Sequence, residues 1–131
     1  MDDLYRDEIL EHYRRPHNFG TLASPDAVHE GSNPLCGDRL TMMLGIGPSG
    51  TVDEVAFTGR GCAISQASAS MLTDSIKGKA LDEVARLGAQ DVLDDLGIEI
   101  SPARLKCALL SLETLQGALT RRVARQVATE G

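Results

Sequence analysis

The sequence predicts an α+β fold, in which helices cover one face of a small antiparallel sheet of about three strands. Residues 3–14 carry apolar side chains at helical spacing. Two segments of alternating apolar and polar residues then flank the turn signal GPSG at residues 47–50. Helical patterns fill most of the remaining chain and end in one long helix. This order of helix, sheet and helices is typical of α+β domains.

The first helix is predicted over residues 3–14. Tyr5, Ile9 and Tyr13 recur every four residues and form one apolar face, and Pro16 ends the pattern. For the two tyrosines, packing in the core or in a homodimer interface is favoured over contact with another partner. The sequence therefore leaves homodimer formation open.

The strands are expected after a loop at residues 21–36, which includes one short edge strand near residues 27–31. Residues 39–46 and 51–59 form an antiparallel hairpin around the turn at 47–50. One face of this hairpin carries Leu40, Met42, Leu44, Ile46, Val55 and Phe57.

The second helix is predicted over residues 65–78, with Ser65 as its N-cap and Gly78 as its stop. Two short helical stretches follow at residues 80–88 and 89–97. The last helix covers residues 101–127. Its buried stripe is predicted to consist of Leu105, Leu109, Leu112, Leu119 and Val123.

Composition and charge limit the classes of function. The chain has 131 residues, which suits one domain spanning residues 1–131. A net charge of −6 argues against nucleic-acid binding, which needs a basic surface. There is no run of about eighteen apolar residues and no signal-peptide pattern, so we expect no membrane span and a cytoplasmic protein. The three cysteines cannot all pair within one chain, and reduced thiols agree with that compartment.

The cysteines are the main functional signal. Cys36 lies in the loop before the first long strand, and Cys62 lies where the second strand leads into a helix. Cys107 lies in the last helix, two residues and therefore about 200° from Leu105, so we expect it on the flank of the buried stripe. In the plain alternative, unpaired cysteines are small buried apolar residues, and no C-x-x-C spacing is present.

The triplet Cys36, Gly37 and Asp38 shifts the balance towards a shared metal site. Three thiolates and one carboxylate can complete a tetrahedron around zinc, or hold one edge of an iron–sulfur cluster. A carboxylate oxygen is a harder ligand than a thiolate and suits iron–sulfur chemistry less well. A mixed donor set of this kind therefore indicates a site from which the bound group is meant to leave.

Three motifs, each with one cysteine, occur in order along the chain. They are NPLCGDRL at residues 33–40, GRGCAISQASASMLTDSIKGK at 59–79 and PARLKCALL at 102–110. Together with LYRDEILEHYRRPHNFG at residues 4–20, they make the chain resemble the U-type iron–sulfur cluster assembly scaffolds, the group of IscU, SufU and NifU N-terminal domains. The resemblance covers nearly the whole chain.

This resemblance implies that Cys36, Asp38, Cys62 and Cys107 bind either zinc or a [2Fe–2S] cluster. It implies a scaffold that accepts persulfide sulfur from a cysteine desulfurase of the SufS or IscS type. A labile [2Fe–2S] cluster would then form on these ligands and pass to recipient apo-proteins. The alternative that it implies is a zinc-bound sulfurtransferase of the SufU type, which activates the desulfurase.

The two branches assign different sulfur acceptors. Arg104, three residues before Cys107, matches SufU, whereas the 44 residues between Cys62 and Cys107 match the shorter IscU spacing. The SufU resemblance favours Cys36 as the persulfide acceptor, and the IscU resemblance favours Cys107. We further hypothesise that Arg104 pairs with Asp38 when the metal is displaced.

Two other classes of function stay open. Cys62, at a strand-to-helix bend, could be the nucleophile of an enzyme, but no histidine lies near it in the sequence to act as a base. The protein could instead be a zinc-stabilised interaction domain. His12, His17 and His29 have no ligand spacing to a cysteine, which favours surface or structural roles for them.

Overall fold

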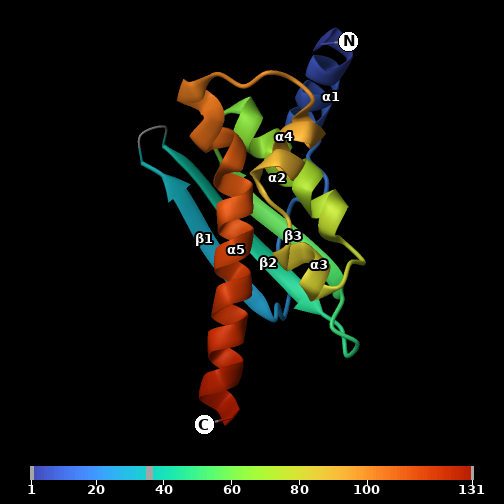
Figure 1. The fold of residues 1–131 in the computed structure, drawn as a ribbon, viewed down its shortest axis with the longest axis vertical. Helices are drawn as coiled ribbons and strands as arrows, with labels where there is room; N and C mark the ends of the chain where they lie inside the picture. The colour runs from blue at the N-terminus through green and yellow to red at the C-terminus, as the bar shows by residue number, and fades with distance from the viewer. Residues whose placement is uncertain (1, 35–36, 131) are drawn as a thin grey trace.

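The fold is α+β, as the sequence predicts, with a three-stranded antiparallel sheet and a long C-terminal helix (Figure 1). The computed structural model describes residues 2–34 and 37–130, and for residues 2–5 and 121–130 it describes the backbone. The elements are α1 (Asp2–Arg14), β1 (Ala27–Asn33), β2 (Asp38–Ile46), β3 (Val52–Arg60), α2 (Ala63–Ile76), α3 (Leu81–Ala85), α4 (Ala89–Leu96) and α5 (Pro102–Glu130).

The sheet has the strand order β1-β2-β3, and both pairs are antiparallel. The predicted edge strand is present and extends to Asn33, which pairs with Asp38 at the start of β2. The outer edge of β3 is covered by the segment after α1. The Phe57 amide donates to the carbonyl of Asn18, and the Gly20 amide donates to the carbonyl of Phe57. This segment therefore satisfies backbone groups that an open edge would leave unpaired.

The core lies between the sheet and the helices that cover one of its faces (Figure 1). The predicted inward face of the hairpin is confirmed, because Leu40, Met42, Leu44 and Phe57 are fully buried there. On α1 the prediction holds only in part. Ile9 is buried, but Tyr13 is 44% exposed and does not pack in the core.

The predicted stripe of α5 is partly wrong. Leu112 is buried and Leu109 packs against the core, but Leu105 is 37% exposed. The buried face of α5 instead consists of Cys107, Ala108, Leu110, Ser111, Leu112, Thr114, Leu115 and Ala118. The reason is that α5 packs against the sheet on one side and against α2 and α4 on another, so its buried arc is wide and includes small polar residues. Val123 lies outside the side chains that the structure describes.

The predicted N-cap of α2 is also wrong. The helix begins at Ala63 with Cys62 as its N-cap, and Ser65 is buried inside the first turn, where its hydroxyl donates to the carbonyl of Cys62. α2 is buried on most of its sides because it contacts α1, α4, α5 and β3. This close packing explains why the helix contains many small residues. Its end agrees with the sequence, because Gly78 takes φ 86° just after the C-cap Lys77.

Within residues 2–34 and 37–130, every helix is too short or too polar to cross a lipid bilayer.

Candidate metal centre

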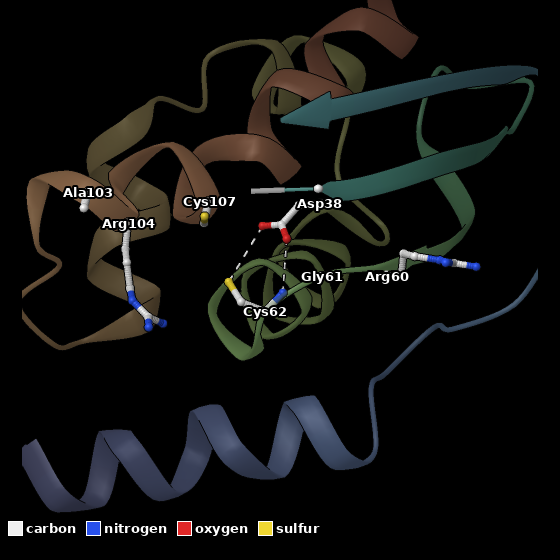
Figure 2. A pocket seen from close by; sticks show the side chains of 8 residues that line it. Asp38, Arg60, Gly61, Cys62, Ala103, Arg104 and Cys107 are labelled. Atoms are coloured by element: carbon white, nitrogen blue, oxygen red, sulfur yellow. Dashed lines mark hydrogen bonds between the residues drawn. The ribbon is translucent and has the colours of Figure 1, made fainter. Parts of the chain in front are cut away.

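Asp38 is the first residue of β2 and lies on the face of the sheet that the helices cover. Its partner across the sheet is Asn33, and the residue is only 3% exposed. A buried carboxylate needs hydrogen bonds or a cation to offset the loss of water. Two groups of Cys62 supply contacts here: its amide donates to Oδ1 of Asp38 at 3.2 Å, and its Sγ lies 3.7 Å from Oδ2 (Figure 2).

Cys62 is placed by the junction between β3 and α2. As the N-cap of α2 it sits at the positive end of the helix dipole, where a negative group is favoured. The preceding Gly61 allows the close approach to Asp38. A Cβ at Gly61 would lie 2.7 Å from Oδ1 of Asp38 and 2.6 Å from the hydroxyl oxygen of Ser65. Only a residue without a side chain therefore fits between β2 and α2 here.

Cys107 comes from α5 and completes the group of described ligands. Its predicted place on the flank of the buried stripe is wrong: Cys107 is 3% exposed and belongs to the buried arc. The wide arc that results from packing on two sides accounts for this difference. The ligand atoms of Asp38, Cys62 and Cys107 all lie within 4.8 Å of one another, although they come from three separate elements.

These three residues line a pocket with a volume of about 480 Å³. Its other lining residues are Gly37, Arg60, Gly61, Ala103 and Arg104. Figure 2 shows the sulfur of Cys62 and the carboxylate of Asp38 facing each other, with Cys107 beside them. The pocket gives two buried ligands a common opening, so a group larger than one ion has room to reach them.

The other predicted site residues stand differently. Cys36 lies outside the residues that the structure describes. Arg104 lines the pocket, but its side chain extends away from Asp38 (Figure 2), and no ion pair joins Arg104 to Asp38 in the part of the chain described. The structure therefore shows Arg104 near the ligands but not paired with Asp38.

Sequence reasoning missed a second cluster of ligand-type side chains. His12, His17 and Asp74 also bring their ligand atoms within 4.8 Å of one another. The separation along the chain explains the omission, because His17 and Asp74 lie 57 residues apart. No local spacing signals a contact that only the packing of α1 against α2 creates. His29 is not a member of this group.

Comparison with known families gives a match over almost the entire chain. The model of the NifU-like N-terminal domain matches residues 4–129. The chain belongs to this family. The family resemblance in the sequence is thereby confirmed.

Relatives within the NifU-like N-terminal family include proteins of two kinds. The zinc-dependent sulfurtransferase SufU of Bacillus subtilis is 35% identical over 92% of this chain and 92% of its own. The iron–sulfur cluster assembly scaffold protein IscU of Aquifex aeolicus is 32% identical over 96% of this chain and 80% of its own. The crystal structure of the N-terminal part of a nitrogen-fixing NifU-like protein from Brucella abortus has a TM-score of 0.73, with 28% identity over 95% of this chain and 96% of that one.

The donor set of this NifU-like domain fits a thiophilic metal. Two sulfurs and one carboxylate oxygen are ligands that zinc accepts in tetrahedral sites, and thiolates are the usual ligands of iron in iron–sulfur clusters. A tetrahedral site needs one more donor. Cys36, two residues from Asp38 in the chain, is the nearest further thiol in the sequence.

Proposed function

We propose that the protein is an iron–sulfur cluster assembly scaffold. It accepts persulfide sulfur from a cysteine desulfurase, assembles a labile [2Fe–2S] cluster on Cys36, Asp38, Cys62 and Cys107, and passes the cluster to recipient apo-proteins. The observation that carries this proposal is the convergence of Asp38, Cys62 and Cys107 at one open pocket. The names of relatives such as the IscU of Aquifex aeolicus support it.

The carboxylate explains why the cluster can leave. A site meant for permanent electron transfer would hold all its irons with thiolate sulfur. Asp38 supplies oxygen instead, and in this structure its carboxylate is held by the amide and the sulfur of Cys62. When iron is lost, the two oxygens of Asp38 can therefore form these contacts with Cys62 again. The position of Asp38 lowers the cost of releasing the cluster.

Sulfur enters by thiol–persulfide exchange. A thiolate of this protein attacks the terminal sulfur of the desulfurase persulfide, a new S–S bond forms, and the desulfurase cysteine leaves as a thiolate. No net oxidation or reduction occurs in this step. Cys36 is the favoured acceptor, because Cys107, the alternative, is 3% exposed and the attacking sulfur must reach another protein. Iron and an electron donor are then needed to convert the bound sulfur to sulfide.

A second candidate function is zinc-dependent sulfur transfer. The 35% identity to the SufU of Bacillus subtilis favours it, and Arg104 lines the pocket at a position that resembles SufU. Zinc would be held by the same four residues and would keep the thiols ionised. The protein would then carry sulfur without building a cluster. Under both functions the partner is a cysteine desulfurase, and homodimer formation and a cytoplasmic location stay predictions.

Anaerobic reconstitution separates the two functions. The chain is mixed with iron, a reductant, cysteine and a cysteine desulfurase, and visible absorption is followed together with the bound iron and zinc. Cluster absorption with bound iron supports the scaffold. Zinc that resists exchange, together with faster desulfurase turnover and no cluster, supports the sulfur carrier and contradicts the scaffold.

A variant pair tests the role of the carboxylate. In Asp38→Ala the cluster should persist longer in the presence of an apo-ferredoxin acceptor, because no carboxylate is left to bind the amide and the sulfur of Cys62 as iron leaves. Asp82→Ala is the matched control, since Asp82 is an exposed carboxylate in the first turn of α3. Equal release rates for Asp38→Ala and the control would remove Asp38 from the mechanism.

A further inference from the structure

A second group of metal-ligand side chains lies between α1 and α2, apart from the cysteines. His12 is on α1, His17 follows α1, and Asp74 is near the end of α2. Each offers one ligand atom, and these atoms lie within 4.8 Å of one another. Helical rise places Asp74 about 18 Å along α2 from Cys62. The two groups are therefore separate sites.

We propose that His12, His17 and Asp74 bind a divalent transition-metal ion of the zinc class. Two imidazole nitrogens and one carboxylate oxygen are a donor set found in zinc sites that keep a fourth position for water. The exposure of the side chains agrees with such an open site, because His17 is 51% and Asp74 46% exposed. The ion would join α1 and the segment after it to α2.

Neighbouring groups hold His12 and Asp74, and His17 contacts Asp74 directly. Asn18 donates from its side-chain amide to Oδ1 of Asp74 at 3.0 Å, and Oδ2 faces Nδ1 of His17 at 2.5 Å. The hydroxyl of Ser70 lies 2.7 Å from Nδ1 of His12 and accepts a hydrogen bond from the backbone amide of His17 at 2.7 Å. Metal-binding histidines and carboxylates are commonly held by such outer partners, which fix the ring orientation and the free oxygen.

The backbone next to the ligands takes a rarely occupied conformation. Asn18 has φ 59°, and in residues 2–34 and 37–130 it is the one non-glycine residue with positive φ. Its carbonyl accepts from the amide of Phe57, and its side chain also donates to the hydroxyl of Thr73. These contacts hold the turn that brings His17 over α2. Backbone strain of this kind concentrates at functional sites.

His12 adds a second imidazole beside the contact between His17 and Asp74. The ring of His12 lies against that of His17, with centroids 4.4 Å apart, so two imidazoles and one carboxylate gather at one point. A metal ion can accept a lone pair from one nitrogen of each ring and from the carboxylate.

Cobalt(II) titration of the full-length, untagged chain tests this site. Thiolate ligands give cobalt strong near-ultraviolet charge-transfer absorption, whereas nitrogen and oxygen ligands give only weaker visible bands. We expect two populations of bound cobalt, one of each type. His12→Gln and Asp74→Asn should each weaken the population without thiolate absorption by more than about 100-fold, since loss of outer partners alone costs 10–100-fold.

Glu8→Gln is the control, because it removes a nearby negative charge without removing a ligand, and it should keep both populations. The proposal is overturned if wild-type cobalt shows thiolate absorption alone, or if both ligand variants keep the second population at unchanged affinity. Failure of the cysteine site would leave this second population in place, so the two proposals are tested separately.

A measurement on the wild-type chain tests the site even if the variants fail to fold. Zinc is added while the imidazole nitrogen resonances are followed by NMR. Resonances of His12 and His17 should shift, and those of His29 should not. His29 is on β1 with its ring against Gly117 of α5, so it is an internal reference. Unchanged resonances of His12 and His17 would contradict the site.

Discussion

The backbone amide of Cys62 donates a hydrogen bond to Oδ1 of Asp38 across 3.2 Å. This contact joins the N-terminus of α2 to the first residue of β2, and therefore fixes two ligands of the candidate centre relative to each other. The residue that permits it is Gly61, which has no side chain to occupy the space between them.

Gly61→Ala should displace the carboxylate of Asp38. The added Cβ would lie 2.7 Å from Oδ1, so the strand or the helix must move, at a cost of about 1–3 kcal/mol for overpacking. Zinc affinity should fall as well, because the ligands separate. Urea unfolding and zinc competition measure the two effects. Gly88→Ala is the control, since nothing lies within 4 Å of a Cβ there, and a similar loss in both variants would contradict the steric argument.

Arg104→Ala should slow sulfur transfer several-fold. Arg104 lines the pocket and is the cation proposed to pair with Asp38 when the metal is displaced. The rate is measured as desulfurase turnover at saturating cysteine in the presence of each variant. Arg86→Ala, which removes an exposed arginine that follows α3, should behave as wild type. An unchanged rate for Arg104→Ala would contradict the hypothesis that Arg104 pairs with Asp38 when the metal is displaced.

Gln66→Met should stabilise the fold by about 1 kcal/mol. Gln66 is 6% exposed, and its side-chain nitrogen has no hydrogen-bond partner among the residues described. Methionine has a similar length and fills the space without an unsatisfied donor. Thermal or urea unfolding measures the change. Gln116→Met on the exposed side of α5 should alter stability by less than about 0.5 kcal/mol, and a loss of stability in Gln66→Met would indicate that the amide has a polar partner.

Asp95→Asn should raise stability at neutral pH. Burial is the main cause that raises the pKa of Asp95 above its ordinary 3.8, although the hydrogen bond from Ser75 opposes the shift. A raised carboxyl pKa means that the folded state holds the proton more tightly than the unfolded chain. The stability contributed by this group is therefore present at low pH and lost as pH rises through the folded pKa.

The advantage of Asp95→Asn should accordingly be largest at about pH 7 and shrink as the pH falls towards the ordinary pKa of aspartate. Unfolding by urea at a series of pH values measures it. Asp82→Asn, in exposed surroundings on α3, is the control for the substitution itself. A gain that is independent of pH would assign the effect to packing instead of titration.

Local sequence patterns predicted correctly the elements in which a simple alternation decides which side chains are buried. The hairpin is one example, because alternation puts Leu40, Met42 and Leu44 on one buried face, and all three are buried. The convergence of Asp38, Cys62 and Cys107 is not visible in any local pattern. A shared metal site was expected from the triplet Cys36, Gly37 and Asp38, and the resemblance to the scaffold family gave the full ligand set.

The predictions that failed concern side chains whose environment depends on several elements. Ser65 has the side chain of an N-cap, but packing on several sides buries it and the cap moves to Cys62. Leu105 continues an apolar repeat and is nevertheless exposed, because the buried arc of α5 is set by the sheet and α2 together. The proximity of His17 to Asp74 likewise depends on how α1 docks on α2.

The segment along β3 has a consequence for truncated forms of the protein. Asn18 and Gly20 occupy the amide and the carbonyl of Phe57, so deletion of the first twenty residues would strip that strand of its cover. The bared strand would be able to pair with the same strand of another molecule, and shortened chains should therefore self-associate. The N-terminal region thus covers an edge that could otherwise join two molecules, besides carrying two of the three histidines.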